Sequence, residues 1–153
     1  MNNILLLAAL GVAAYFALFP GTSIPDKPEL PDSSGFSSDA ADHTNAALEN
    51  AISTRLGNQQ LAGQAVVVKI LPDDNKGSRH QRFIVKLNSG RTILVAHNID
   101  LAQRIDTLRT GDTIAFFGEY EWNQKGGVMH WTHHDPQGRH PNGWIKHNGQ
   151  IYQ

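Results

Sequence analysis

Three patterns of hydrophobic and polar residues divide the chain. Residues 4–19 are apolar on every side of a helix, residues 20–41 hold four prolines and several serines, and residues 42–153 mix apolar and polar positions at regular spacing. The middle stretch has too little apolar surface to form a core. The sequence therefore predicts an N-terminal helix, a disordered linker over 20–41 and one folded domain over 42–153.

Residues 1–19 predict a membrane anchor. A bilayer-spanning helix needs about 20 apolar residues, whereas the hydrophobic part of a cleaved signal peptide has roughly 7–15. The apolar run of 16 residues lies between these lengths, and no clear cleavage site follows it. We expect a single-pass anchor, or an uncleaved signal, in a bacterial inner membrane with the domain facing the periplasm. The chain has no cysteine, which excludes disulfides and thiolate metal sites.

The folded domain begins with a helix and continues as strands. Apolar residues at helical spacing predict a helix from Asp42 to Leu56, which Gly57 closes. Apolar runs and alternating patterns then predict five strands, at 65–71, 80–87, 91–97, 113–120 and 128–133. The connection at 98–110 has room for a helical turn. Asn148-Gly149 predicts a hairpin near the C-terminus.

Five strands in this order resemble an OB-fold, an all-β, five-stranded barrel. The resemblance rests on the long hairpin pair over 65–97, the connection after it, and a strand that Gly111-Asp112 opens and Phe117-Gly118 ends. This layout is similar to that of small bacterial periplasmic OB-fold proteins. The resemblance implies a ligand face on the second and third strands, where OB barrels bind oligonucleotides or oligosaccharides.

A narrower resemblance covers residues 60–153. The segments 72–81, 95–100 and 118–123 are similar to those of an uncharacterised bacterial domain family. Members of that family share an ending of the form His130-Trp131-Thr132-His133, His140-Pro141 and Gly143-Trp144-Ile145. The resemblance brings no activity with it.

Charge favours an anionic ligand for the folded domain. The whole chain has a net charge of −1, but the part from Gln64 onward holds 11 basic and 8 acidic side chains. This bias is far below that of a dedicated nucleic-acid binder. The ligand-binding residues expected on the second and third strands and near the barrel mouth are Arg79, His80, Arg82, His97, Asn98, Arg139, Trp131 and Trp144.

Histidines gather near the C-terminus. Five of the eight lie between residues 130 and 147, and histidine is both easily poised near neutral pH and the commonest metal ligand. If the strand continues to residue 133, His130 and His134 lie on one face about 13 Å apart, too far for one metal. A bend before Pro136 removes that limit. It makes His134, Asp135 and His140 the first candidates to bind a divalent ion such as zinc.

Three functions are open from the sequence. The first is a module that binds an anionic polymer, above all nucleic acid, through a His-rich pocket. The second is a His-dependent or metal-assisted phosphodiesterase or nuclease. The third is a structural partner in an envelope complex. Apart from these functions, the histidines could serve only to cap turns and to satisfy buried backbone groups. The catalytic candidates of the second function are His134, Asp135, His140, His133, His130 and Glu119.

Overall fold

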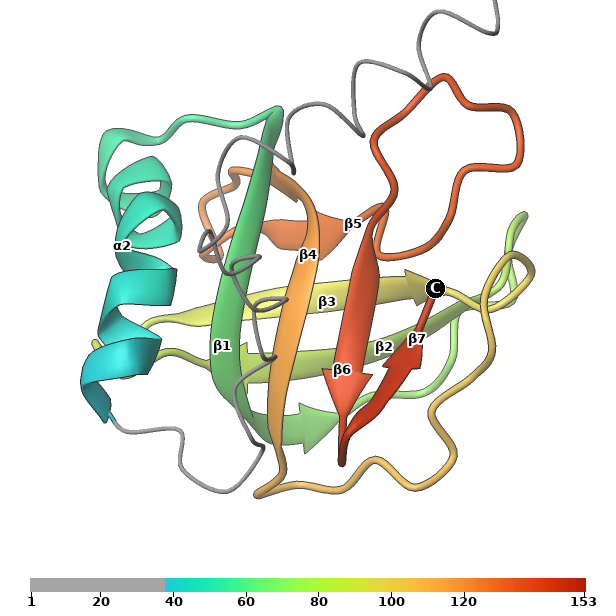
Figure 1. The fold of residues 1–153 in the computed structure, drawn as a ribbon, viewed down its shortest axis with the longest axis horizontal. Helices are drawn as coiled ribbons and strands as arrows, with labels where there is room; N and C mark the ends of the chain where they lie inside the picture. The colour runs from blue at the N-terminus through green and yellow to red at the C-terminus, as the bar shows by residue number, and fades with distance from the viewer. Residues whose placement is uncertain (1–37) are drawn as a thin grey trace, which may run out of the picture. The chain divides into compact units, whose positions relative to one another are not determined.

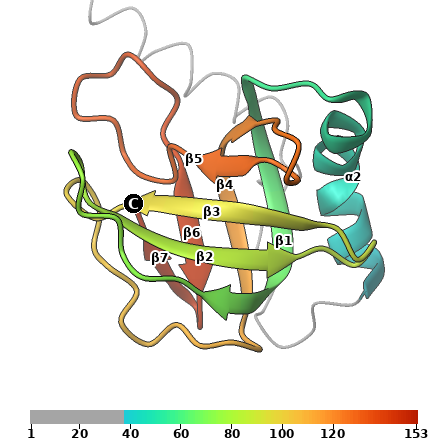
Figure 2. The same cartoon turned by 180° about the vertical axis from the view of Figure 1, so that it is seen from behind.

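A helix and seven strands make up the part of the chain that the computed structural model describes, residues 38–153 (Figures 1 and 2). The predicted anchor over 1–19 lies outside this range, as does the predicted linker up to residue 37. Within residues 38–153, no helix is both long and apolar enough to cross a membrane. The elements are α2 (Ser38–Thr54), β1 (Gln59–Ile70), β2 (His80–Lys86), β3 (Thr92–Asn98), β4 (Thr113–Glu121), β5 (Val128–His130), β6 (Trp144–His147) and β7 (Gln150–Tyr152).

Five of the strands close into a barrel. The order of pairing is β1-β2-β3-β5-β4, and β4 pairs with β1 to close the circle. β1 pairs with two strands: its first half pairs with β4 and its second half with β2. The register shifts between Val67 and Lys69. β3 and β5 are parallel, and the other pairs are antiparallel. The predicted fold class, an OB-type barrel with a short leading helix, is confirmed.

The remaining two strands extend the wall of the barrel at β4. β6 pairs with the first half of β4, from Ile114 to Phe117, while β5 pairs with its last residues, from Glu119 to Glu121. The predicted C-terminal hairpin is present as β6 and β7. Asn148 and Gly149 form its turn with φ angles of 49° and 80°.

Alternation along the strands fills the barrel interior. In β2 the buried residues alternate with half-buried ones, as the sequence predicts, and Phe83 and Val85 are fully buried. Position 63 of β1 requires glycine, because the Phe116 ring occupies the space that a side chain would need. A Cβ at Gly63 would lie 2.4 Å from Cζ of Phe116. Leu48 of α2 belongs to the same core cluster.

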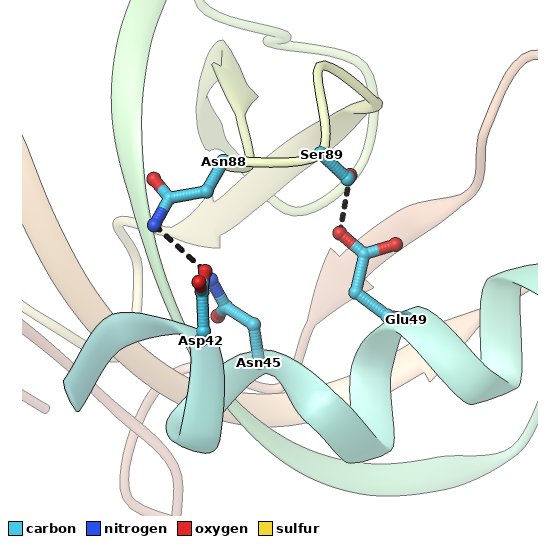
Figure 3. Close-up of a pocket in the computed structure, with 5 residues that line it drawn as sticks. All are labelled: Asp42, Asn45, Glu49, Asn88 and Ser89. Carbon is cyan, nitrogen blue, oxygen red and sulfur yellow. Dashed lines mark hydrogen bonds between the residues drawn. The ribbon is translucent and has the colours of Figure 1, made fainter. Parts of the chain in front are cut away.

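Polar contacts attach α2 to the barrel. The side chain of Asn45 donates to the carbonyl of Gln64 and accepts from its amide, both at 2.8 Å. Figure 3 shows two further contacts at the turn between β2 and β3, Asn88 with Asp42 and Ser89 with Glu49. The pocket between these residues is thus lined by groups that bind one another.

The helix and β1 begin earlier than the sequence predicts. α2 starts at Ser38, inside the segment predicted as linker, and ends at Thr54 because Arg55 adopts a left-handed conformation with φ of 60°. The predicted closing role of Gly57 is wrong. β1 starts at Gln59 rather than at residue 65, since pairing with β4 stabilises a stretch whose glutamines gave no apolar signal.

β5 ends earlier than predicted. It stops at His130 instead of residue 133, because Trp131 has a φ of 52° and turns the chain out of the ladder. The alternation predicted for residues 130–134 is therefore wrong. The connection at 98–110 contains turns but no helix.

Candidate functional site

A row of side chains crosses the outer face of the barrel. Gln60 of β1 lies opposite Glu119 of β4, and Glu119 lies opposite His130 of β5. Continuing the β3–β5 register places His130 beside Ala96 of β3, which pairs with Arg82 of β2. The row therefore brings together residues from all five strands of the barrel.

A shallow groove of about 410 Å³ lies along this row. Small and apolar side chains of β3 and β5 form its floor, and charged or imidazole groups form its walls. It crosses β2, β3 and β5, which lie side by side in Figure 2. Its lining residues are Asp74, His80, Arg82, Leu94, Ala96, Glu121, Val128 and His130.

Glu119 is the centre of a polar cluster beside the groove, which Glu121 and His130 of the same cluster line. Its Oε2 accepts a hydrogen bond from Nε2 of His140 at 2.7 Å, and its Oε1 lies 3.3 Å from Nε2 of His130. Glu121 follows two residues later on the same face of β4. Glu119, Glu121 and His130 each place a nitrogen or oxygen within 4.8 Å of the other two, and all three are half-buried. The cluster thus combines two carboxylates and an imidazole.

His140 reaches this cluster from the loop over residues 131–143. The carboxylate of Asp135 accepts hydrogen bonds from the backbone amides of Arg139 and His140 at 2.7 and 2.8 Å. The imidazole of His140 stacks on Trp131, with ring centroids 4.1 Å apart and planes 7° apart. Asp135 therefore fixes the backbone of His140, and Trp131 fixes its ring against Glu119.

The loop is closed where it meets the barrel. The amide of Gly143 donates to the carbonyl of His133 at 2.9 Å. A Cβ at Gly143 would lie 1.9 Å from the carbonyl oxygen of Trp131, so only glycine fits between the two ends. The position of His140 is thus set by the junction as well as by the loop.

The pKa values of the two imidazoles beside Glu119 are shifted in opposite directions. Burial lowers the pKa of His130, and the carboxylates of Glu119 and Glu121 offset this only in part. Burial also lowers the pKa of His140, but hydrogen bonds to Glu119 and to the carbonyl of Pro141 outweigh it and raise the pKa above its ordinary value. Both ring nitrogens of His140 face acceptors, at 2.7 and 2.9 Å, which suits a protonated ring.

Comparison with known proteins places this arrangement in a family. Residues 32–153 match the model of a family described as "Protein of unknown function (DUF3465)". The chain belongs to this family. No curated protein and no solved structure matches it. The region matched to DUF3465 contains the whole groove, the Glu119 cluster and the loop over 131–143, so the site is part of the family's domain.

His97 does not lie on the ligand face, and this expectation is wrong. Its side chain is fully buried inside the barrel. Nε2 donates to the carbonyl of Gln103 at 3.2 Å, which leaves Nδ1 to accept from the hydroxyl of Thr132 at 2.9 Å. Burial lowers the pKa of His97 to about 4. The ring is neutral and joins the start of the loop to the barrel interior.

Several predicted ligand-binding side chains already have partners. Arg79 forms an ion pair with Asp100 at 2.6 Å. The side-chain oxygen of Asn98 accepts a hydrogen bond from the backbone amide of Asp100. Arg82 donates twice to the carbonyl of Pro72, at 3.1 and 3.0 Å, and its Nη1 lies 3.7 Å from the carboxylate of Asp74, which lines the groove with it. Arg139 is exposed, and Trp144 lies 6.4 Å from Phe117 between ring centroids.

The predicted metal ligands are not gathered together. His134 is exposed, His133 is buried with Nδ1 donating to the carbonyl of His134, and Asp135 binds backbone amides of its own loop. Within residues 38–153, the one group of side chains at metal-ligand distances is Glu119, Glu121 and His130. Sequence reasoning missed Glu121. Strand alternation from Glu119 was the available signal, because it puts both carboxylates on one face.

Proposed function

We propose that this domain hydrolyses phosphodiester bonds in single-stranded nucleic acid, with Glu119 and His130 at the reacting centre. The observation that carries the proposal is the position of Glu119 between two imidazoles, one of which, His130, lines a groove that Arg82 also lines. Carboxylates and imidazoles activate water, and a guanidinium stabilises the charge of a phosphoryl group.

The width of the groove supports a single strand. His130 on β5 and Arg82 on β2 are separated by β3, so their backbones lie about 10 Å apart, two strand spacings. Ala96 between them leaves room above the floor. A phosphodiester placed there meets the guanidinium on one side and the Glu119 cluster on the other, while a duplex is too wide to enter.

The reaction follows from these positions. A water held near Oε1 of Glu119 and Nε2 of His130 attacks the phosphorus and forms a new phosphorus–oxygen bond. The ester bond on the opposite side of the phosphorus breaks, and the proton lost by the water ends on the departing oxygen. Arg82 stabilises the additional negative charge of the transition state.

Hydrolysis accounts for the groove better than binding alone. A site that only binds phosphates gains affinity from free cations. Here Arg79, Arg82 and Arg91 are paired with Asp100, Asp74 and Glu49, and three carboxylates lie in or beside the groove. These carboxylates repel a polyanion, but they serve a reaction that activates water. We therefore place the binding of nucleic acid as the first step of hydrolysis.

The predicted location completes the proposal. An anchor over residues 1–19 would hold the domain at the bacterial inner membrane on its periplasmic side. A reporter that works only in the periplasm, fused after Gln153, is expected to be active, and activity of a cytoplasmic reporter alone contradicts this orientation. We further propose that the ending from His130 to Ile145 marks the same site throughout the family.

Cleavage of a labelled single-stranded DNA or RNA oligonucleotide by the full-length protein in detergent tests the activity. Glu119→Gln and His130→Gln are expected to reduce the cleavage rate about 100-fold or more, in line with the loss of a catalytic group. His134→Gln is the matched control, because His134 is an exposed histidine of the adjacent loop. It is expected to cleave at the wild-type rate.

Parallel purification of the variants excludes a contaminating nuclease. Equal cleavage by wild-type protein and both site variants would show that the activity does not belong to this site. No cleavage of either nucleic acid by the wild-type protein would overturn the proposed reaction.

A further inference from the structure

We propose that Glu119, Glu121 and His130 bind a divalent transition-metal ion. The inference deepens the proposed hydrolysis, on which its catalytic meaning rests, but the binding itself can be measured without any substrate. The ligand set differs from the one expected from the sequence, since of the three residues only His130 comes from the His-rich segment.

The strand register creates the ligand set. Glu119 and Glu121 are two residues apart on β4 and share its outer face, and His130 of β5 lies directly opposite Glu119. One atom of each side chain lies within 4.8 Å of the others. Ligand atoms in a tetrahedral site with bonds near 2.1 Å lie about 3.4 Å apart. Short rotations of these side chains therefore bring all three atoms to coordination distance.

His130 offers a nitrogen that is unused. Its Nε2 is screened from solvent and has no hydrogen-bond partner among residues 38–153. The 3.3 Å approach to Glu119 is close enough for attraction but does not form a hydrogen bond. A buried polar atom without a partner is destabilising. Coordination of a cation between His130 and Glu119 gives this nitrogen a partner.

His140 prepares Glu119 for the same role. It donates to Oε2 at 2.7 Å, which fixes the carboxylate plane and leaves Oε1 on the side of His130. Carboxylates that bind metals are commonly held by such an outer hydrogen bond. Trp131 and Asp135 fix His140 in turn, so the carboxylate is oriented by a chain of contacts that runs through the loop.

The donor atoms select the class of metal. Imidazole nitrogen suits zinc, iron, copper and nickel, whereas magnesium and calcium prefer sites made only of oxygen. One nitrogen with two carboxylates therefore favours a first-row ion such as Zn²⁺ or Mn²⁺ over Mg²⁺. Three protein ligands leave at least one coordination position open, which is typical of catalytic rather than structural sites. An ion there would hold the attacking water at the wall of the groove.

Titration of the metal-free full-length protein with Zn²⁺ by calorimetry, and with Mn²⁺ by electron paramagnetic resonance, tests the site. One ion is expected to bind per chain and to raise the melting temperature as its concentration exceeds Kd. Glu121→Gln and His130→Gln are expected to weaken binding by more than the roughly 10–100-fold that loss of an outer contact costs. His134→Gln tests the ligand set expected from the sequence, because His134 is exposed and outside the cluster, and it is expected to bind as the wild type does.

Each result decides the inference. Circular dichroism of Glu121→Gln and His130→Gln establishes that the variants are folded before their affinities are compared. Absence of binding, or equal affinity in folded Glu121→Gln, His130→Gln and wild type, overturns the metal site. Cleavage that continues in chelator would then leave the proposed hydrolysis standing without a metal. Binding that the two variants abolish, in a protein that cleaves no nucleic acid, would support the site and overturn the hydrolysis instead.

Discussion

Histidine occupies two different surroundings in this barrel, the interior and the outer face. His97 and His147 are fully buried, and their hydrogen-bond partners are Gln103 and Thr132 for the first and Asp112, at 2.8 Å, for the second. His130 and His140 are half-buried and share one carboxylate on the outer face. The same residue type thus joins parts of the fold in one place and borders a groove in the other.

The difference shows which property separates a structural histidine from a candidate functional one. Both ring nitrogens of His97 are bound to neutral groups, and its pKa is lowered to about 4, so the ring stays neutral and fixed. On the outer face Nε2 of His130 has no hydrogen bond and belongs to a side chain that lines the groove. Nδ1 of His147 has no hydrogen bond either, but that side chain is fully buried and does not line the groove. A count of histidines along the sequence does not separate these cases, because the deciding property is what each ring nitrogen faces.

The largest expected effect on stability comes from replacing the buried His97. His97→Ala removes a fully buried ring and leaves the Thr132 hydroxyl and the Gln103 carbonyl without their partner. We expect the free energy of unfolding to fall by about 4 kcal/mol, as for other large truncations in a core. Urea unfolding followed by circular dichroism measures it. His134→Ala, at an exposed position, is expected to change stability by less than about 0.5 kcal/mol.

The pH dependence of stability is expected to report the same buried ring. Because the folded pKa of His97 is about 4, below its ordinary value of 6.5, the unfolded chain binds more protons in this interval. Stability contributed by the neutral ring is therefore present above pH 6.5 and is lost as the pH falls toward 4, by about 3 kcal/mol. Urea unfolding at pH 7 and pH 4.5 measures the loss. An equal loss in His97→Gln would show that another group is responsible.

The point where the loop over 131–143 meets the barrel is expected to tolerate little change. At Gly143 an added Cβ would lie 1.9 Å from the carbonyl oxygen of Trp131 and 2.6 Å from that of Phe117. We expect Gly143→Ala to lower the free energy of unfolding by about 2 kcal/mol through overpacking. Gly149→Ala is the comparison, because nothing lies within 4 Å there and only the φ of 80° opposes a side chain. It is expected to cost about 1 kcal/mol, and equal melting temperatures for the two variants would contradict the role of the junction.

The smallest global effect is expected from the loop itself. Asp135→Asn replaces a charged acceptor of backbone amides by a weaker one, while the barrel strands are untouched. We expect the amides of Arg139 and His140 to exchange with solvent about tenfold faster, with protection of β2 and β3 unchanged. Hydrogen exchange measured by nuclear magnetic resonance tests this. Faster exchange throughout the barrel would show that loop and barrel unfold together.

Much of the barrel is predictable from local patterns. Buried Phe83 and Val85 alternate with half-buried neighbours, and Asn148-Gly149 forms the expected turn. The start of β1 is not predictable in this way. Gln59 and Gln60 become strand residues only because β4 supplies their hydrogen bonds, and that pairing joins residues about 60 positions apart along the chain.

The site was predictable in part. Alternation alone places Glu119 and Glu121 together, and Ile93 and Val95 put His97 on the inward face, so these two signals were present in the sequence. The end of β5 was not, because a left-handed conformation at Trp131 is rare for a residue with a side chain. The contact of His140 with Glu119 depends on the path of a whole loop, for which no periodic pattern exists.

The arrangement of β5 and β6 has a consequence for how such a protein changes over generations. Both strands lie along one edge of β4, and the chain between them departs and re-enters at the bonded pair His133 and Gly143. The loop over 131–143 is thus an insertion between two strands that pair with the same edge of β4. A longer or shorter loop leaves the strand pairing that closes the barrel unaltered. Changes within the loop that carries His140 can therefore occur without altering the pairing of the barrel strands.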